Sequence, residues 1–159
     1  MHEQAFTKHA ATLFDNFVQF DKFYLVGGTS LALQIGHRLS VDFDWFTSEE
    51  LPDNLLQKVK RVFSSCLISV TYRSPEQLNV LIAGIQTTFL QYPYPVVDAL
   101  VSYRGLALAS VREIAAMKAL AVGKRLSYKD YVDWYFLRDP VERRTIQEFL
   151  ETTVRNFKL

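Results

Sequence analysis

Apolar residues recur along the chain in two rhythms, which predict helices in some segments and strands in others. Residues 3–20 and 55–65 carry apolar side chains at helical spacing, so each segment is predicted to form an amphipathic helix. Short apolar runs predict strands at residues 23–26, 67–72, 78–82 and 85–90. The dipeptide Ala83-Gly84 separates the last two runs and predicts a hairpin turn.

The rest of the chain predicts one more strand and then helices. A short edge strand is expected over residues 106–108. Ser110 and Glu113 match a capping box, which predicts a helix from that point to about residue 122. Further helices are expected over residues 127–138 and 141–157.

This order of elements predicts an α+β fold with one mixed β-sheet, flanking helices and a C-terminal helical segment. The length of 159 residues is typical of one domain. We therefore expect a single domain over residues 1–159. Its α/β core is expected over residues 1–108, with the helical segment 109–159 packed on it.

Two glycines follow the predicted strand at residues 23–26. Gly27 and Gly28 precede the hydroxyl side chains of Thr29 and Ser30, where a helix over residues 29–36 is expected to begin. Glycines let a ligand approach the backbone closely. The free N–H groups at a helix start favour phosphate, so this turn is a candidate phosphate site.

A pair of aspartates follows that helix on a second predicted strand. Asp42 and Asp44 are one residue apart, so their carboxylates share one face of a strand, opposite Val41, Phe43 and Trp45. The usual ligand for two such carboxylates is a divalent cation such as Mg²⁺ or Mn²⁺. A solvated edge strand is the alternative, but the apolar neighbours favour a cleft. Together with the glycine turn, the aspartates indicate a metal–nucleotide site.

Several charged residues outside this region are further candidates. Lys118 projects from the apolar side of its predicted helix, where it can either extend to the solvent or contact a phosphate. Asp130 and Asp133 share one helical face, which can be solvated, paired with lysine or part of the site. The predicted apolar stripe of the same helix lies beside them and consists of Tyr128, Tyr131, Val132 and Tyr135. Arg38 is a candidate phosphate ligand, whereas His37 is expected to be structural.

Composition narrows the possible partners and the cellular location. Apolar residues make up 49% of the chain, which is enough for a substantial core, and the net charge of +1 indicates no dominant polyanionic partner. Cys66 is the single cysteine, which excludes an internal disulfide. No run approaches the roughly 18 apolar residues of a membrane span. These features predict a cytoplasmic protein that does not enter a membrane.

Two blocks of the chain carry a recognisable pattern. The first is Gly27–Arg38 with Ser40–Phe46, and the second is Val111–Lys118 with Lys129–Leu137. Together they resemble the AbiEii-type nucleotidyltransferases, which belong to the DNA polymerase beta-like superfamily and include toxins of type IV toxin–antitoxin systems. The resemblance implies a polymerase beta-like fold. It also implies transfer of a nucleoside monophosphate from a nucleoside triphosphate to an acceptor such as RNA, and a cognate antitoxin.

The same resemblance implies a role for each matching residue. Asp42 and Asp44 would bind Mg²⁺ or Mn²⁺ and, with Lys118, would be catalytic. The nucleotide would be held by Gly27, Gly28, Thr29, Ser30, Arg38, Lys118, Asp130 and Asp133.

One position departs from the pattern of the superfamily, which usually carries a third carboxylate on a later central strand. Thr88 stands at that position and cannot accept a proton at neutral pH. Asp98 or Glu76 could substitute, catalysis could be weakened, or the domain could bind nucleotide or a partner without chemistry. The two leading hypotheses are thus an enzyme and a non-catalytic binding module. A metal-dependent phosphohydrolase is disfavoured because the glycine turn then has no task.

Overall fold

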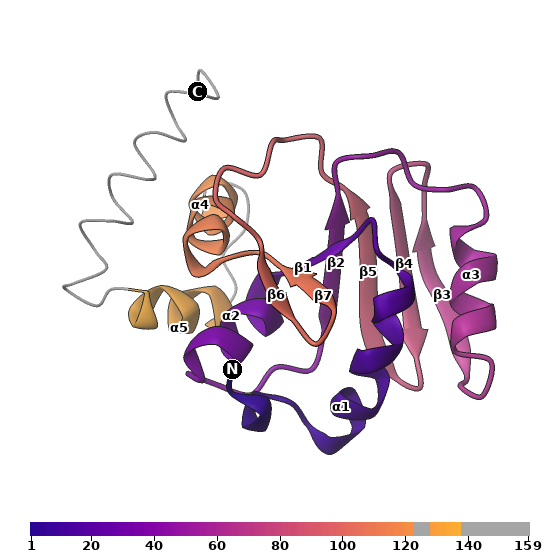
Figure 1. Cartoon of the computed structure of the whole chain (residues 1–159), viewed down its shortest axis with the longest axis horizontal. Helices are drawn as coiled ribbons and strands as arrows, with labels where there is room; N and C mark the ends of the chain where they lie inside the picture. Colours follow the sequence, from indigo (N-terminus) through magenta and orange to yellow (C-terminus); the bar gives the residue numbers. More distant parts are fainter. Residues whose placement is uncertain (123–127, 138–159) are drawn as a thin grey trace.

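A computed structural model of the chain describes residues 1–122 and 128–137. A mixed, seven-stranded β-sheet forms its centre, with the strand order β3-β4-β5-β2-β1-β7-β6 (Figure 1). The strands are β1 (Tyr24–Val26), β2 (Phe43–Thr47), β3 (Ile68–Arg73), β4 (Gln77–Ile82), β5 (Ile85–Gln91), β6 (Val101–Tyr103) and β7 (Leu106–Leu108). The predicted α+β class with one mixed sheet is therefore confirmed.

Helices pack around this sheet. They are α1 (Lys8–Phe14), α2 (Gly27–Ile35), α3 (Leu55–Val62), α4 (Val111–Val122) and α5 (Tyr128–Phe136), with the 3-10 helices η1 (Glu3–Ala5) and η2 (Asp15–Gln19). In Figure 1, α3 lies beside β3, whereas α4 and α5 lie toward the end formed by β6 and β7. The helix predicted over residues 141–157 lies outside the described residues.

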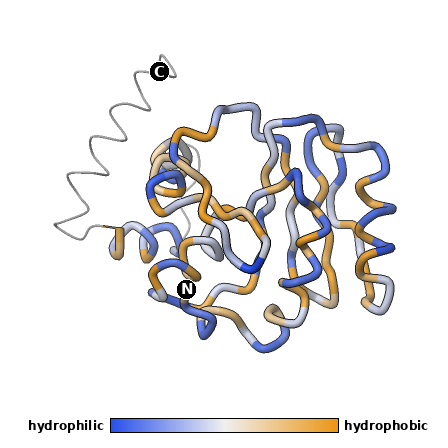
Figure 2. The backbone as a smooth tube through the Cα atoms, in the orientation of Figure 1, coloured by the Kyte–Doolittle hydropathy of each residue, from blue (hydrophilic) through white to orange (hydrophobic). Residues whose placement is uncertain are grey.

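Alternating side chains on the central strands divide the core into two clusters, one on each face of the sheet. Phe43 and Trp45 of β2 pack with Phe17 and other aromatic residues from the N-terminal helices. On the opposite face, Val26 and Ile114 belong to a second cluster that joins β1, α2 and α4. Hydrophilic and hydrophobic residues alternate along α3, as expected for a helix with one buried side (Figure 2).

The register of the central strands brings three separate segments together. β1 is antiparallel to β2 and pairs Val26 with Asp44. β2 is parallel to β5 and pairs Asp44 with Thr88. The first residues of α2, which directly follow Val26, therefore lie next to Asp44 and Thr88.

Several predicted boundaries are wrong. The N-terminal helix predicted over residues 3–20 is divided into η1, α1 and η2, because Phe6 forms a β-bridge with Ser40 and Thr7 caps a new helix. β6 was not predicted, and β7 is an inner strand between β1 and β6 rather than an edge strand. Helix α2 begins at Gly27, two residues earlier than expected, and β2 begins after Val41, which is exposed.

Only one of the two hydrogen bonds of the capping box predicted for α4 is formed. The backbone N–H of Glu113 donates to the Ser110 hydroxyl at 3.1 Å, as a capping box requires. The Glu113 carboxylate instead accepts from the backbone N–H groups of Val97 and Asp98. Glu113 therefore anchors the loop after β5 to the start of α4.

None of the helices in the described parts of the chain is long and apolar enough to cross a membrane.

The aromatic core supplies the first testable prediction. Phe17 is fully buried, with its ring centroid 4.7 Å from that of Trp45 and 5.1 Å from that of Phe43. Phe17→Ala is expected to lower the free energy of unfolding by about 3–5 kcal/mol, measured by urea denaturation. Val18→Ala is the matched control, because Val18 is 48% exposed and its truncation should cost little. Equal losses in the two variants would contradict this core.

Candidate active site

A cleft of about 540 Å³ opens where α2, β2, α4 and α5 meet. Nine of the residues singled out in the sequence line it: Gly27, Gly28, Thr29, Arg38, Asp42, Asp44, Lys118, Asp130 and Asp133. Of the residues expected to bind the metal or the nucleotide, Ser30 alone lies outside it, because its hydroxyl is buried and donates to the carbonyl of Ala109 at 3.0 Å.

Both glycines at the start of α2 make room for charged side chains. Gly27 has a φ of 69°, and a Cβ atom added there would lie 2.7 Å from Oδ2 of Asp44. A Cβ atom on Gly28 would lie 1.9 Å from Nη2 of Arg38. Each glycine therefore allows a cleft side chain to pack directly against the backbone. The residue before the helix, Val26, provides no side-chain cap for its N–H groups.

The two hydroxyls after the glycines hold the backbone in place. The Thr29 hydroxyl lies 2.7 Å from that of Ser40 and also donates to the carbonyl oxygen of Asp42. It thus fixes the segment that carries the first aspartate. Ser30 connects α2 to the residue just before Ser110, which caps α4.

The aspartate pair lies at the edge of the cleft. Asp44 lies on β2, whereas Asp42 precedes the strand, so the prediction that both belong to it is wrong. Both side chains nevertheless line the cleft. Lys129 Nζ lies 3.2 Å from Oδ2 of Asp42, which partly balances its charge.

The carboxylates of the cleft are the candidate ligands for a metal ion. Among residues 1–122 and 128–137, no group of three or more His, Cys, Asp or Glu side chains is arranged to hold a metal. Mg²⁺ is typically bound by one or two carboxylates, with water and substrate phosphates completing the coordination. Asp42 and Asp44 fit that pattern, in which a nucleotide brings the remaining oxygen ligands.

Asp133 is the centre of a buried charge cluster. Its carboxylate accepts from Nε of Arg38 at 2.7 Å and from Nε2 of His37 at 2.6 Å, and it pairs with Nζ of Lys118 at 2.8 Å. Lys118 also donates to Asp130 at 2.9 Å. Burial alone would raise the pKa of Asp133, but the bonds from His37, Arg38 and Lys118 hold that pKa well below its usual range.

These contacts decide between the alternatives left open for α5. Its acidic face is paired with lysine, as one of these alternatives predicted, and both carboxylates also line the cleft. The aromatic stripe predicted to be the apolar face is instead exposed: Tyr128, Tyr131 and Tyr135 are 84%, 59% and 70% exposed. The helix is thus held by its paired charges and by Trp134, which packs against the second core cluster, and not by its tyrosines.

Sequence reasoning missed several residues of the cleft. Lys129 precedes Asp130 in the second block of the family pattern and could have been found from that position. Asn79 and Gln86 carry neutral amides on β4 and β5, and nothing in their local sequence marks them. Thr88 lies in the cleft beside Asp44. The two suggested substitutes for a third carboxylate, Asp98 and Glu76, do not line the cleft.

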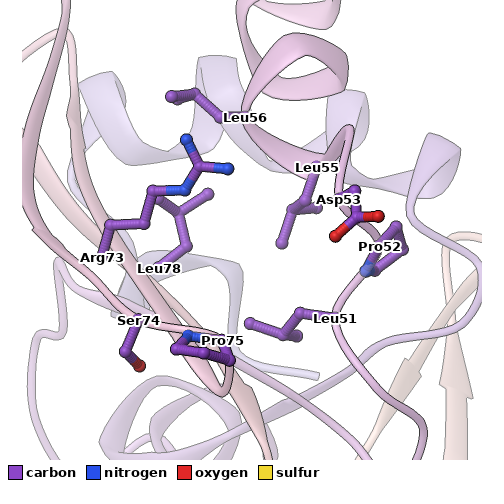
Figure 3. Close-up of a pocket in the computed structure, with 9 residues that line it drawn as sticks. All are labelled: Leu51, Pro52, Asp53, Leu55, Leu56, Arg73, Ser74, Pro75 and Leu78. Atoms are coloured by element: carbon purple, nitrogen blue, oxygen red, sulfur yellow. The ribbon is translucent and has the colours of Figure 1, made fainter.

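Another cavity, of about 370 Å³, lies between the loop before α3 and the turn joining β3 to β4 (Figure 3). Leu55 and Leu78 form part of its apolar lining, and Arg73 and Asp53 are its charged residues. It shares no residue with the cleft, and it lacks paired carboxylates and a glycine turn. The cleft is therefore the candidate active site.

Comparison with known proteins identifies the class. Residues 11–107 match the family described as the nucleotidyl transferase AbiEii toxin of type IV toxin–antitoxin systems. This match covers more than half of the chain, which therefore belongs to the AbiEii nucleotidyltransferase family and confirms the resemblance seen in the sequence. An uncharacterized protein of Aquifex aeolicus (strain VF5) is 37% identical over 117 residues, which are 72% of this chain and 57% of that protein. The chain thus spans little more than half the length of that relative.

Solved structures confirm the polymerase beta-like fold. A proposed nucleotidyltransferase from H. pylori superimposes with a TM-score of 0.70 at 19% identity, covering 98% of this chain and 79% of that one. ANT(2″)-Ia, in complex with adenylyl-2″-tobramycin, superimposes with a TM-score of 0.63 at 10% identity. That match covers 95% of this chain and 99% of the other. At these identities the likeness establishes the fold only.

The close packing of Gly28 against Arg38 gives a second prediction. Gly28→Ala should displace the guanidinium and weaken its pairing with Asp133, lowering the free energy of unfolding by about 1–2 kcal/mol. The measurement is a double-mutant cycle with Arg38→Ala in urea denaturation. In the Arg38→Ala background the added methyl group has no guanidinium to displace, so its cost should disappear. The same cost in both backgrounds would refute this explanation of Gly28.

The charge cluster predicts a specific dependence of stability on pH. Because the folded pKa of Asp133 lies below its ordinary value of 3.8, its charge stabilises the fold fully above about pH 4. This contribution is lost as the pH falls below about 4 toward the folded pKa. Asp133→Asn should cost about 3–5 kcal/mol at pH 7, because it leaves buried cations without a counter-charge.

The test is urea denaturation of the wild type and Asp133→Asn from pH 7 to pH 3. Their difference in unfolding free energy should be constant at higher pH and shrink at the acid end. Asp53→Asn removes an exposed carboxylate outside the cleft and serves as the control. A difference between wild type and Asp133→Asn that stays constant down to pH 3 would contradict the proposed charge state.

Proposed function

We propose that this protein is a metal-dependent nucleotidyltransferase that moves a nucleoside monophosphate from a nucleoside triphosphate to an acceptor hydroxyl. One observation carries the proposal: the glycine start of α2, the pair Asp42 and Asp44, and Lys118 all line a single cleft. We further propose RNA as the acceptor, a toxin-like role and a cognate antitoxin. Membership of a family described as type IV toxins supports these last points.

Each part of the cleft has a task in this reaction. The N–H groups at the start of α2 would bind the triphosphate, and the cations of Lys118 and Arg38 would balance its charge. Asp42 and Asp44 would hold Mg²⁺ or Mn²⁺, which neutralises the triphosphate and aids departure of pyrophosphate. The protein mainly positions the reacting groups and provides charge. Asp130 and Asp133 would orient Lys118.

The mouth of the cleft supports an acceptor with bases and phosphates. Tyr128 and Lys129 both line the cleft and are strongly exposed. An aromatic ring and a cation that line the same opening suit a single-stranded nucleic acid, which offers a base for stacking and a phosphate for pairing. The tobramycin adduct bound to ANT(2″)-Ia represents a different acceptor class on the same fold, so the acceptor requires a direct assay.

A second candidate function is a nucleotide-binding or partner-binding module without catalysis. The observation that favours it is Thr88, which lies directly across from Asp44 in the register of β2 and β5. A threonine hydroxyl neither accepts a proton at neutral pH nor binds a metal as strongly as a carboxylate does. Such a module would still bind a magnesium–nucleotide complex.

A transfer assay separates the two functions. The protein is incubated with each α-labelled nucleoside triphosphate, Mg²⁺ or Mn²⁺, and total bacterial RNA. We expect label on RNA with the wild type. The variant Asp42→Ala/Asp44→Ala should label at least about a hundredfold less, a loss typical of removing groups that stabilise charge in the transition state.

Two further variants serve as controls for the transfer assay. Lys22→Ala removes an exposed surface ion pair with Glu49 and should not change labelling. If the wild type binds nucleotide but labels nothing, while Thr88→Asp labels RNA, the binding-module function is correct for the natural chain. If the wild type neither binds nucleotide nor labels any acceptor, the proposed function is wrong.

A further inference from the structure

A further cavity, of about 450 Å³, continues from the cleft along the face of the sheet. Its lining shares six residues with the cleft: Gly27, Asp44, Asn79, Thr88, Lys118 and Asp130. The remaining residues come from β1, β2, β4, β5 and α4 and from the loop after β5. We call this space the side cavity. A molecule bound by its phosphates in the cleft could extend directly into it.

The side cavity is mainly apolar away from the cleft. Leu90 and Met117 face it from β5 and α4, together with the buried side chain of Ile114. Lys118, at the boundary with the cleft, is the one cationic residue among the described residues that line it. This lining suits an uncharged, flat or apolar group rather than a phosphate.

An aromatic ring in the side cavity is held in a fixed position. The Tyr92 ring centroid lies 5.2 Å from that of Phe46 and 4.9 Å from that of Tyr94. The backbone N–H of Tyr92 donates to the carbonyl of Thr47 at 2.7 Å. Burial, followed by the nearby Glu113 and Tyr94, raises the pKa of the Tyr92 phenol to about 12, so it stays neutral. A fixed neutral ring of this kind is a stacking surface for a base.

Two amides beside this ring present a donor and an acceptor. Nε2 of Gln77 donates to Oδ1 of Asn79 at 2.9 Å, which orients both side chains. Within the described part of the chain, no hydrogen bond engages Nδ2 of Asn79 or Oε1 of Gln77, so both atoms can bond to a ligand. Amides in this arrangement match the hydrogen-bonding edge of a nucleobase.

We propose that the side cavity binds the nucleoside part of a substrate, with the base against Tyr92 and its edge toward Gln77 and Asn79. This inference rests on the proposed function and names the residues that select the base. The nucleoside can belong to the triphosphate or to the end of the acceptor, because Asp44 and Thr88 border the cavity and both substrates must meet there. Gln77 and Tyr92 line the side cavity but not the cleft, so they can be changed separately from the catalytic residues.

The experiment is calorimetry of the full chain with Mg²⁺ and ATP, GTP, CTP or UTP, and with inorganic triphosphate as a probe that lacks a nucleoside. At least one nucleotide should bind the wild type more tightly than inorganic triphosphate does. Tyr92→Leu should weaken that nucleotide about tenfold, the loss expected for one stacked base, and leave inorganic triphosphate unchanged. Tyr92→Phe keeps the ring and should restore binding. Gln77→Leu should change the order of preference among the four nucleotides.

The control and the remaining outcomes identify which substrate is bound. Tyr72→Leu changes an exposed tyrosine on β3, outside both spaces, and should have no effect. If Tyr92→Leu leaves every nucleotide affinity unchanged but raises KM for RNA at least fivefold, the nucleoside in the cavity is that of the acceptor. If neither quantity changes, the inference is wrong while the proposed function stands. If the wild type binds neither nucleotide nor inorganic triphosphate, both are wrong.

Discussion

The arrangement of the cleft depends on one buried carboxylate, that of Asp133. Its partners come from the segment after α2, which carries His37 and Arg38, and from α4, which carries Lys118. Buried charges are tolerated only when they are paired, so each of these side chains would be costly without the others. One side chain on α5 therefore sets the position of two helices relative to the sheet. Trp134 of α5 adds an apolar contact with the second core cluster, whereas the tyrosines of the helix are exposed and do not contribute.

The glycine turn is best understood as part of the same arrangement. Arg38 reaches Asp133 by passing directly over Gly28, and Asp44 lies against Gly27. Any side chain at these positions would first displace a cleft residue of the protein itself. The absence of side chains at the start of α2 thus brings a cation, a carboxylate and free backbone N–H groups within a few ångströms of each other. That concentration of unlike charges is what a metal–nucleotide complex requires.

The sequence predicted what depends on local pattern and missed what depends on distant contacts. The central strands and the aspartate pair were visible because apolar runs and alternation are local signals. The break in the N-terminal helix was not visible, because Phe6 pairs with Ser40 across the fold. The orientation of α5 was predicted wrongly, because its tyrosines have the spacing of a buried stripe. Asp133 instead pairs with His37, which lies 96 positions away in the chain. This distant contact turns the acidic side of α5 inward and leaves the tyrosines exposed.

The charge cluster also determines how an anion could enter the cleft. An ammonium group has three N–H donors, and the two aspartates of α5 take two of those on Lys118. Arg38 uses Nε and Nη2 for Asp133 and Nη1 for the carbonyl of Leu39, yet a guanidinium has five N–H donors. Counted over the contacts among residues 1–122 and 128–137, both cations therefore keep donors for a phosphate while remaining paired with the protein. A triphosphate can add to this cluster without breaking it, so binding need not disturb the contacts that stabilise the fold.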